Sequence, residues 1–378
     1  MLLMCSAGVL AGAPVGRTIR RSAPPAQPLV VPQGEVYRVK NLEAACNYLL
    51  EQAIACKKEI WLQLDEGVLS QEERDRLFFL LPSYRMAEMR VMVLDNIYKL
   101  EPRYKSCVRM LNYARGNKEV KLTAEEMRAL QTAQKVLEGL EVQGKTSAET
   151  ALALHDWIVL HSAYDAANAN RKYPADHVGY NPFDGKYLLL EHKGVCDAYV
   201  QAYWLLLQLA GVPCSMVSGY VPAQGQGHAW MLVNMGDHWG HVDATFDDPM
   251  PDREGQVQHT YFDKTDKEME QTHRWEQEMF PNAKGEGFMI REALHFDTLD
   301  DMVAYITQHP PGEYVVEVAE HRAAKEPQVI VLHAVQNALP DRRVSVVRDP
   351  FYPHALRLIV QLEAVDKPQG DRRLTVGE

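Results

Sequence analysis

The sequence predicts an α+β protein in which a central cysteine-containing domain is flanked by two small α/β modules. A long apolar run over 200–210 ends at Gly211-Val212-Pro213, as expected of a buried helix with a defined stop. Short strand-like runs follow at 215–221 and around 228–245. Alternating strand and helix patterns precede and follow this block. At 378 residues the chain is long enough for two or three domains.

The composition excludes several classes of protein. The chain is 46% hydrophobic and 24% charged, which is an ordinary globular balance. A net charge of -11 repels phosphate backbones, so we expect no nucleic-acid partner. No run of 18 apolar residues exists, so we expect no transmembrane helix. Six cysteines without a CxxC pair indicate neither a zinc framework nor a dense disulfide scaffold, and no cofactor is implied.

The N-terminal segment, 1–34, has the composition of a clipped export signal and a linker. Residues 1–13 are apolar and small, and Ala11-Gly12-Ala13 is similar to a signal cleavage site, although no basic region precedes it. Residues 17–32 are rich in proline and arginine, as linkers often are. We expect an exported protein, periplasmic, secreted or on the cell surface; the alternative is an uncleaved N-terminus on a cytoplasmic protein. Residues 366–378 are expected to be a frayed tail.

Two α/β modules, 35–105 and 291–365, share a weak internal similarity. The similarity equates Arg38 with His295 and Gln63 with Glu317. The alternative is that any two βαβ segments look alike. The modules carry no evident chemistry, so they either dock a protein partner or only package the central domain. The expected elements of the first module are strands over 36–39, 60–64 and 89–94 and helices over 42–56 and 71–81, the last opened by a Ser70/Glu73 capping box.

The central domain, 106–290, begins with helices. Capping boxes at Thr123-x-x-Glu126 and Thr146-x-x-Glu149 mark the starts of two of them. The segment 168–186 reads as a long polar loop leading toward the cysteine, and such loops are often functional. We expect it to form a wall or lid of a cleft.

Three residues in this domain form the parts of a nucleophilic triad. Cys196 lies where a glycine-containing segment ends and the apolar helix begins, and a helix N-terminus favours the thiolate form. His228 and Asp243 follow on two strand-like runs. A thiol, an imidazole and a carboxylate are a nucleophile, its base and an orienting acid. Cys196 taken alone would read as a small buried residue on an apolar helix.

The triad requires His228 and Asp243 on one face of a hairpin. A two-residue loop at Met235-Gly236 would place them directly opposite each other, with Cβ atoms about 4.5–5.5 Å apart. A loop at Gly236-Asp237 would leave them diagonal on the same face. A three-residue loop would put them on opposite faces, and the triad would fail.

Several short motifs follow one another along the chain: Gly194-Val195-Cys196, Tyr199, Gly211-Val212-Pro213, His228-Ala229-Trp230, Trp239, Val242-Asp243, Thr245, Asp247 and Pro249. In this order they resemble the transglutaminase-like superfamily, a group with a papain-like core. The match runs from about Leu152 to Pro249, with Ala198 where the family usually has glycine and Met231 where asparagine often stands. A helix ending at Tyr164-Asp165 before the cysteine segment is also similar to the family.

The resemblance implies Cys196 as nucleophile, His228 as base and Asp243 as orienting acid in an acyl-transfer enzyme. If water accepts the acyl group, the enzyme is a protease or amidase, and microbial relatives with this short pattern more often look like these. If a lysine amine accepts it, the enzyme is a cross-linking transglutaminase. The substrate is expected to be a peptide or protein. A third hypothesis is a cell-surface binding or scaffold protein that keeps the fold without activity. No acidic loop of EF-hand type indicates calcium control.

The remaining candidates carry weaker signals. Tyr180 or Asn181 is a candidate side-chain donor to an oxyanion, beside the backbone N–H of Cys196. Trp230 either packs the hairpin or roofs the cleft. His241 shares the face of His228 and Asp243, so a metal site with Cys196 as fourth ligand is conceivable, but no spacing supports it. Asp247 and Asp248 read as turn formers.

Overall fold

The structure is a computed structural model of the 378-residue chain. It describes residues 36–65, 67–70, 73, 86–173, 177–248, 250, 257–284, 293–348 and 355–362. The expected export segment and linker 1–34, most of the helix expected over 71–81, Pro249 and the expected tail 366–378 lie outside the described residues. Within the described residues, no helix is both long enough and apolar enough to cross a membrane.

The chain divides into two compact units, 1–287 and 288–378. The boundary lies three residues before the one that the sequence indicates at 290. The module 35–105 and the central domain up to 287 both belong to the first unit.

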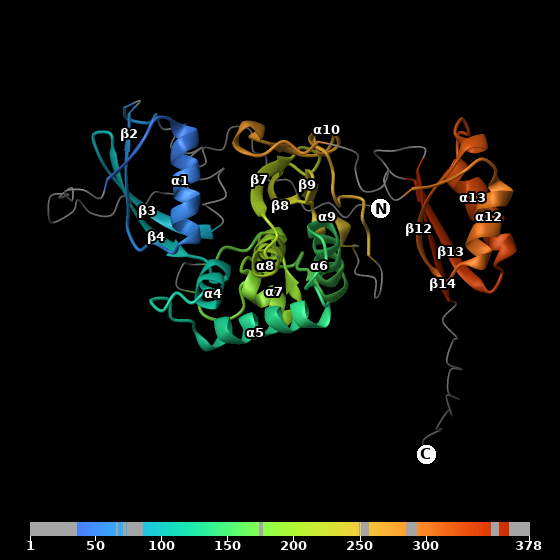
Figure 1. Ribbon diagram of the computed structural model, residues 1–378, viewed down its shortest axis with the longest axis horizontal. Helices are drawn as coiled ribbons and strands as arrows, with labels where there is room; N and C mark the ends of the chain where they lie inside the picture. The colour runs from blue at the N-terminus through green and yellow to red at the C-terminus, as the bar shows by residue number, and fades with distance from the viewer. Residues whose placement is uncertain are drawn as a thin grey trace, which may run out of the picture. The chain divides into compact units, whose positions relative to one another are not determined.

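The N-terminal module is a four-stranded sheet in the order β1-β2-β4-β3 with helix α1 against it (Figure 1). Its core holds Leu49 of the helix with Leu62 and Leu100 of the strands, all fully buried. The Ser70/Glu73 capping box is present, with reciprocal bonds of 2.7 and 3.1 Å. The last strand, β4, was not predicted from the sequence. The elements are β1 Tyr37–Val39, α1 Leu42–Ile54, β2 Ile60–Leu64, β3 Ala87–Leu94 and β4 Ile97–Tyr104.

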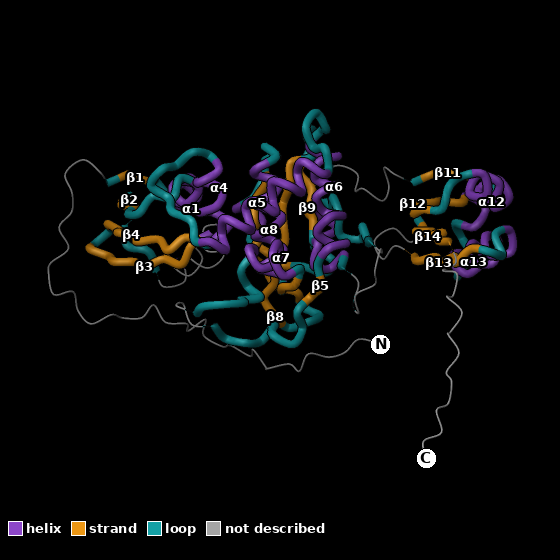
Figure 2. The backbone as a smooth tube through the Cα atoms, turned by 90° about the horizontal axis from the view of Figure 1, so that it is seen from below, coloured by secondary structure: helices purple, strands orange, loops and turns teal. Residues whose placement is uncertain are grey.

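The C-terminal module has the same topology. Its strand order is β11-β12-β14-β13, and Figure 2 shows α12 and α13 on one face of the sheet. In both modules the first pair of strands is parallel and the others antiparallel. The elements are β11 Leu294–Phe296, α12 Leu299–Gln308, β12 Gly312–Val318, a 3₁₀ turn Ala319–His321, α13 Pro327–Ala338, β13 Arg342–Arg348 and β14 Leu356–Leu362.

The register of the parallel strands agrees with the internal similarity of the sequence. Arg38 is paired with Gln63 in the first module, and His295 with Glu317 in the second. These are the two pairs of positions that the similarity equates. The modules are therefore repeats in topology and in register.

Helix α8, which begins at Cys196, is the centre of the central domain. It is buried on almost every side and packs against α4, α5, α6, α7 and the strands β7 and β8 (Figure 1). A helix that is apolar all round needs such a complete cover. The helical elements are α4 Ser106–Ala114, α5 Ala124–Gly139, α6 Ser147–His161, α7 Gly185–Glu191, α8 Cys196–Leu209, α9 Ala244–Asp247, α10 Asp266–Met269 and a 3₁₀ turn Gln277–Met279.

Both capping boxes predicted for this domain are present, at the starts of α5 and α6. Helices α4 and α7 were not predicted from the sequence, and α7 begins inside the segment expected to be a loop over 168–186. The strands form a sheet in the order β10-β7-β8-β9 and a short pair β5-β6. Their bounds are β5 Ala163–Tyr164, β6 Lys193–Gly194, β7 Cys214–Val221, β8 Gln226–Asn234, β9 Trp239–Val242 and β10 Arg274–Trp275.

The strands of the hairpin β8–β9 pair in the register expected for a two-residue loop at Gly236-Asp237. Asn234 pairs with Trp239, and the N–H of Met235 donates to the carbonyl of His238 at 2.8 Å. Gly236 has a φ of +117°, a conformation that side chains disfavour. The loop at Met235-Gly236 is therefore wrong, but the Gly236-Asp237 loop keeps the required parity.

Candidate active site

Cys196 is the first residue of α8, held there by a close contact behind it. A Cβ atom added to Gly194 would lie 2.6 Å from the Cβ of Ala198, so only glycine permits this approach. The glycine also joins the helix start to the end of α6, because Tyr164 pairs with Gly194 in β5–β6. The Tyr-Asp pair and the cysteine motif, separate in the sequence, thus lie side by side. Val195, the N-cap, places no side-chain hydrogen bond on the first turn of the helix.

The base and the acid meet as the hairpin parity requires. Nε2 of His228, on β8, lies 2.6 Å from Oδ2 of Asp243, which directly follows β9. Oδ1 of the same carboxylate accepts the N–H groups of Thr245 and Phe246 at 3.1 and 3.2 Å. Asp243 therefore has two roles, since it caps the short helix α9 and orients the imidazole.

The charges of this pair support each other. Burial alone would lower the pKa of His228, but the Asp243 carboxylate and a hydrogen bond with the thiol of Cys196 raise it to about 10. Burial alone would raise the pKa of Asp243, yet the charge of His228 holds it well below its usual range. With Nε2 turned to Asp243, Nδ1 is the ring nitrogen left to face Cys196. The imidazole of His228 therefore lies between the Asp243 carboxylate and the thiol of Cys196.

A second histidine, which the sequence analysis missed, shares the carboxylate. Nε2 of His273 lies 3.2 Å from Oδ2 of Asp243, and its Nδ1 lies 2.7 Å from the hydroxyl of Thr272. Burial lowers the pKa of His273, so the ring is neutral and its Nε2–H donates to Asp243. No motif marked this residue. It precedes β10, and only the pairing of β10 with β7 brings it to the site.

We expect His273→Ala to reduce kcat by about 10- to 150-fold, because a hydrogen bond to a charged group contributes about 1.5–3 kcal/mol. The substitution leaves the nucleophile and base in place, so KM should change little. His273→Gln, whose amide can still donate, should retain more of the activity. Equal losses in both variants, at unchanged melting temperature, would contradict a positioning role.

The other residues named from the sequence have definite places. The hydroxyl of Tyr180 donates to the buried Asp165 at 2.8 Å, and Asp165 donates its N–H to the carbonyl of Gly194. Tyr180 thus lies beside the segment leading to Cys196. The side-chain oxygen of Asn181 accepts the N–H of Phe183 at 3.0 Å. A role for either in binding an oxyanion stays a prediction.

Trp230 and His241 are internal. Trp230 is fully buried, and its Nε1–H donates to Nδ1 of His241 at 3.0 Å. Nε2 of His241 faces Asp266 at 2.9 Å. Trp230 therefore packs the hairpin, with no exposed surface of its own. Among the described residues, the cluster around the triad that has metal-ligand geometry is His228, Asp243 and His273, without His241.

The two acids before Pro249 were wrongly expected to be simple turn formers. Asp247 is fully buried and contacts Nε2 of His155 at 3.2 Å. Asp248 is also buried and accepts the hydroxyl of Tyr199 of α8. They attach the segment after Asp243 to α6 and α8, and so help to fix the position of the Asp243 carboxylate.

A cavity of about 770 Å³ lies elsewhere, between the N-terminal module and the helices α4, α5 and α7. Asn181, His177 and Arg109 are among its lining residues, but Cys196, His228 and Asp243 are not. We assign the chemistry to the triad because reactive groups converge there.

Comparison with known proteins agrees with the motifs. A family model described as the transglutaminase-like superfamily matches residues 131–244. Human kyphoscoliosis peptidase is 32% identical over 114 residues, which are 28% of this chain and 16% of the human protein. The match therefore spans well under two thirds of that relative.

Two solved structures are similar at low identity. One, described as a TGase, has a TM-score of 0.29 at 16% identity, covering 61% of this chain and 64% of its own. The other, a candidate cysteine protease from Cytophaga hutchinsonii, has a TM-score of 0.26 at 14% identity, covering 46% and 65%. Over residues 131–244, which include Cys196, His228 and Asp243, the chain carries a domain of the transglutaminase-like superfamily.

Proposed function

We propose that the chain is a cysteine-dependent acyl-transfer enzyme that acts on amide bonds of peptides or proteins, with water as the acceptor. The observation that carries this is the bonding of His228, which contacts Asp243 through Nε2 at 2.6 Å and the thiol of Cys196 on its other side. This is the order of contacts by which a base activates a nucleophile and an acid orients the base.

The reaction follows from these positions. The Cys196 thiolate attacks the amide carbonyl, and a C–S bond forms as the carbonyl oxygen becomes an oxyanion. The backbone N–H of Cys196, at the start of α8, is placed to donate to that oxygen. His228 gives its proton to the leaving nitrogen as the C–N bond breaks, which leaves an acyl-enzyme. His228 then takes a proton from water, which attacks the thioester and releases the acid.

Asp243 keeps the imidazole in the productive orientation throughout. Its four hydrogen bonds, to His228, His273, Thr245 and Phe246, leave the carboxylate little freedom. Replacing water by a lysine amine would give a cross-link with the same catalytic residues, so the acceptor separates hydrolysis from transglutamination.

In this proposal the flanking modules dock the protein substrate or a partner.

Side-by-side assays of peptide hydrolysis and amine incorporation test the proposal. We expect hydrolysis to dominate, with a product acid detected by mass spectrometry and little incorporation of a labelled primary amine. Dominant amine incorporation would make the chain a transglutaminase. Inactivity in both assays, with Cys196 reacting with iodoacetamide at pH 6 no faster than free cysteine, would favour a binding protein that keeps the fold.

A further inference from the structure

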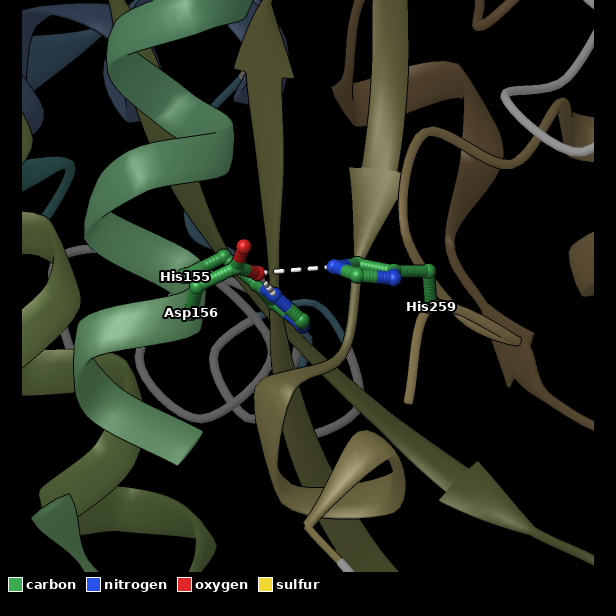
Figure 3. A group of neighbouring side chains, drawn as sticks. All are labelled: His155, Asp156 and His259. Atoms are coloured by element: carbon green, nitrogen blue, oxygen red, sulfur yellow. Dashed lines mark hydrogen bonds and ion pairs between the residues drawn. The ribbon is translucent and has the colours of Figure 1, made fainter. Parts of the chain in front are cut away.

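A second group of titratable side chains shares no residue with the triad and is connected to the segment that follows Asp243 through Asp247. His155 and Asp156 are neighbours on α6, and His259 faces them from the segment 257–262 (Figure 3). Oδ1 of Asp156 lies 2.9 Å from Nδ1 of His155 and 2.7 Å from Nε2 of His259. One ligand atom of each residue lies within 4.8 Å of the other two. The catalytic mechanism uses none of these three residues.

The far side of His155 is bonded as in a metal-ligating histidine. Its Nε2 lies 3.2 Å from Oδ2 of Asp247, which is fully buried. Oδ1 of Asp247 accepts the N–H of Tyr261 at 2.8 Å, so the carboxylate is fixed. A histidine that binds a metal through one nitrogen usually donates its other N–H to such a carboxylate. Asp247 thus holds His155 with Nδ1 turned toward Asp156.

We propose that His155, Asp156 and His259 bind a divalent cation of the zinc type, with Asp247 as the outer partner of His155. Two imidazoles and one carboxylate are a nitrogen-rich set that suits zinc and its neighbours in the first transition row. Calcium and magnesium take oxygen ligands, and the set offers only one carboxylate. Water would complete the coordination, because Asp156 and His259 keep 33% and 12% of their side-chain surface exposed.

The spacing fits an ion after a small movement. Around a tetrahedral zinc ion with bonds of about 2.0–2.1 Å, neighbouring ligand atoms lie about 3.4 Å apart. The two contacts of Asp156 are somewhat shorter, so its carboxylate must retreat by roughly half an ångström. Asp156 is half-exposed and can do so, while the buried His155 stays in place. The ion would take the place of the proton shared between Nδ1 of His155 and Oδ1 of Asp156.

Such an ion would be structural and would act close to the catalytic acid. The N–H of Asp243 donates to the carbonyl of Tyr261 at 3.0 Å, and the N–H of Phe262 to that of His259 at 3.2 Å. A metal joining His259 to α6 would therefore fix the turn that holds the backbone of Asp243. This inference does not depend on the proposed acyl-transfer activity.

Metal content is the direct test. Untagged full-length protein is stripped with EDTA, dialysed, loaded with Zn²⁺, passed over a desalting column and analysed by mass spectrometry of the metal. We expect one ion per chain and a higher melting temperature in the loaded protein. His259→Ala should weaken Zn²⁺ affinity by more than about 100-fold, and Asp247→Asn by about 10- to 100-fold, as outer partners usually do.

Matched variants separate this site from other histidines. His238 also lies between two carboxylates, Asp237 at 2.6 Å and Asp263 at 2.9 Å, but belongs to no convergent group of three among the described residues. His238→Ala should therefore keep the ion. Cys196→Ala should also keep it, although the triad cluster could attract a metal. With Co²⁺ as the probe, wild type should show the visible absorption of a tetrahedral ion, and His259→Ala should not.

Three results would overturn the proposal. One is wild-type protein that retains no Zn²⁺ after desalting. Another is undiminished affinity in folded His259→Ala protein. The third is an ion that is lost in Cys196→Ala but kept in His259→Ala, which would place it at the triad.

Discussion

Replacing Cys196 with alanine should abolish turnover and leave the protein folded. The substitution removes the only atom that can form the acyl-enzyme, and loss of the equivalent nucleophile in a serine protease cost about 10⁶ in kcat. Cys196 is half-buried at the start of α8, so little packing volume is lost. The measurement is kcat on the substrate identified by the paired assays, with circular dichroism and a thermal melt as checks of folding.

Cys214 provides the matched control. Its sulfur accepts a hydrogen bond from Gln208 at 3.5 Å at the start of β7, and it takes no part in the triad. Cys214→Ala should keep turnover close to that of wild type. A Cys196→Ala protein with activity within about tenfold of wild type would remove this residue from the mechanism.

Inserting one residue after Gly236 should reduce kcat about as much as Asp243→Ala. The insertion shifts β9 against β8, and a shift of one residue turns every side chain of the strand to the opposite face. His228 then loses its orienting acid, and in a serine protease the loss of that acid cost about 10⁴ in kcat. One residue inserted after Gly144, in the turn between α5 and α6, is the control for chain length and should be tolerated.

The pH profile distinguishes a lost acid from general damage. In wild type the Asp243 carboxylate helps to raise the pKa of His228 to about 10, so the imidazolium persists to that pH and is lost above it. Without Asp243 the proton leaves earlier, and the alkaline limb of kcat/KM should move toward the ordinary histidine value of about 6.5. The insertion and Asp243→Ala should share this movement. Full activity with an unmoved limb in a folded insertion variant would contradict the dependence on register.

Local patterns in the sequence were sufficient for much of this protein. Capping boxes, apolar periodicity and glycine stops depend on neighbours within a few residues, so they predicted the starts of α5 and α6 and the extent of α8. The ordered motifs predicted that Cys196, His228 and Asp243 form one group. The positions that the internal similarity equates also pair in the same way in both modules, Arg38 with Gln63 and His295 with Glu317.

Only the tertiary structure determined how the triad is supported. His273 reaches Asp243 through the pairing of β10 with β7, and Asp247 reaches His155 from a different part of the chain. Pairings over such distances are decided by packing of the whole domain, and no local pattern encodes them. The hairpin β8–β9 is an example. The need to keep His228 and Asp243 on one face limited the turn to two-residue loops, but only the folded sheet selected the loop at Gly236-Asp237. Propensity acts between neighbours in the sequence, whereas the Asp243 carboxylate is positioned by contacts from distant segments.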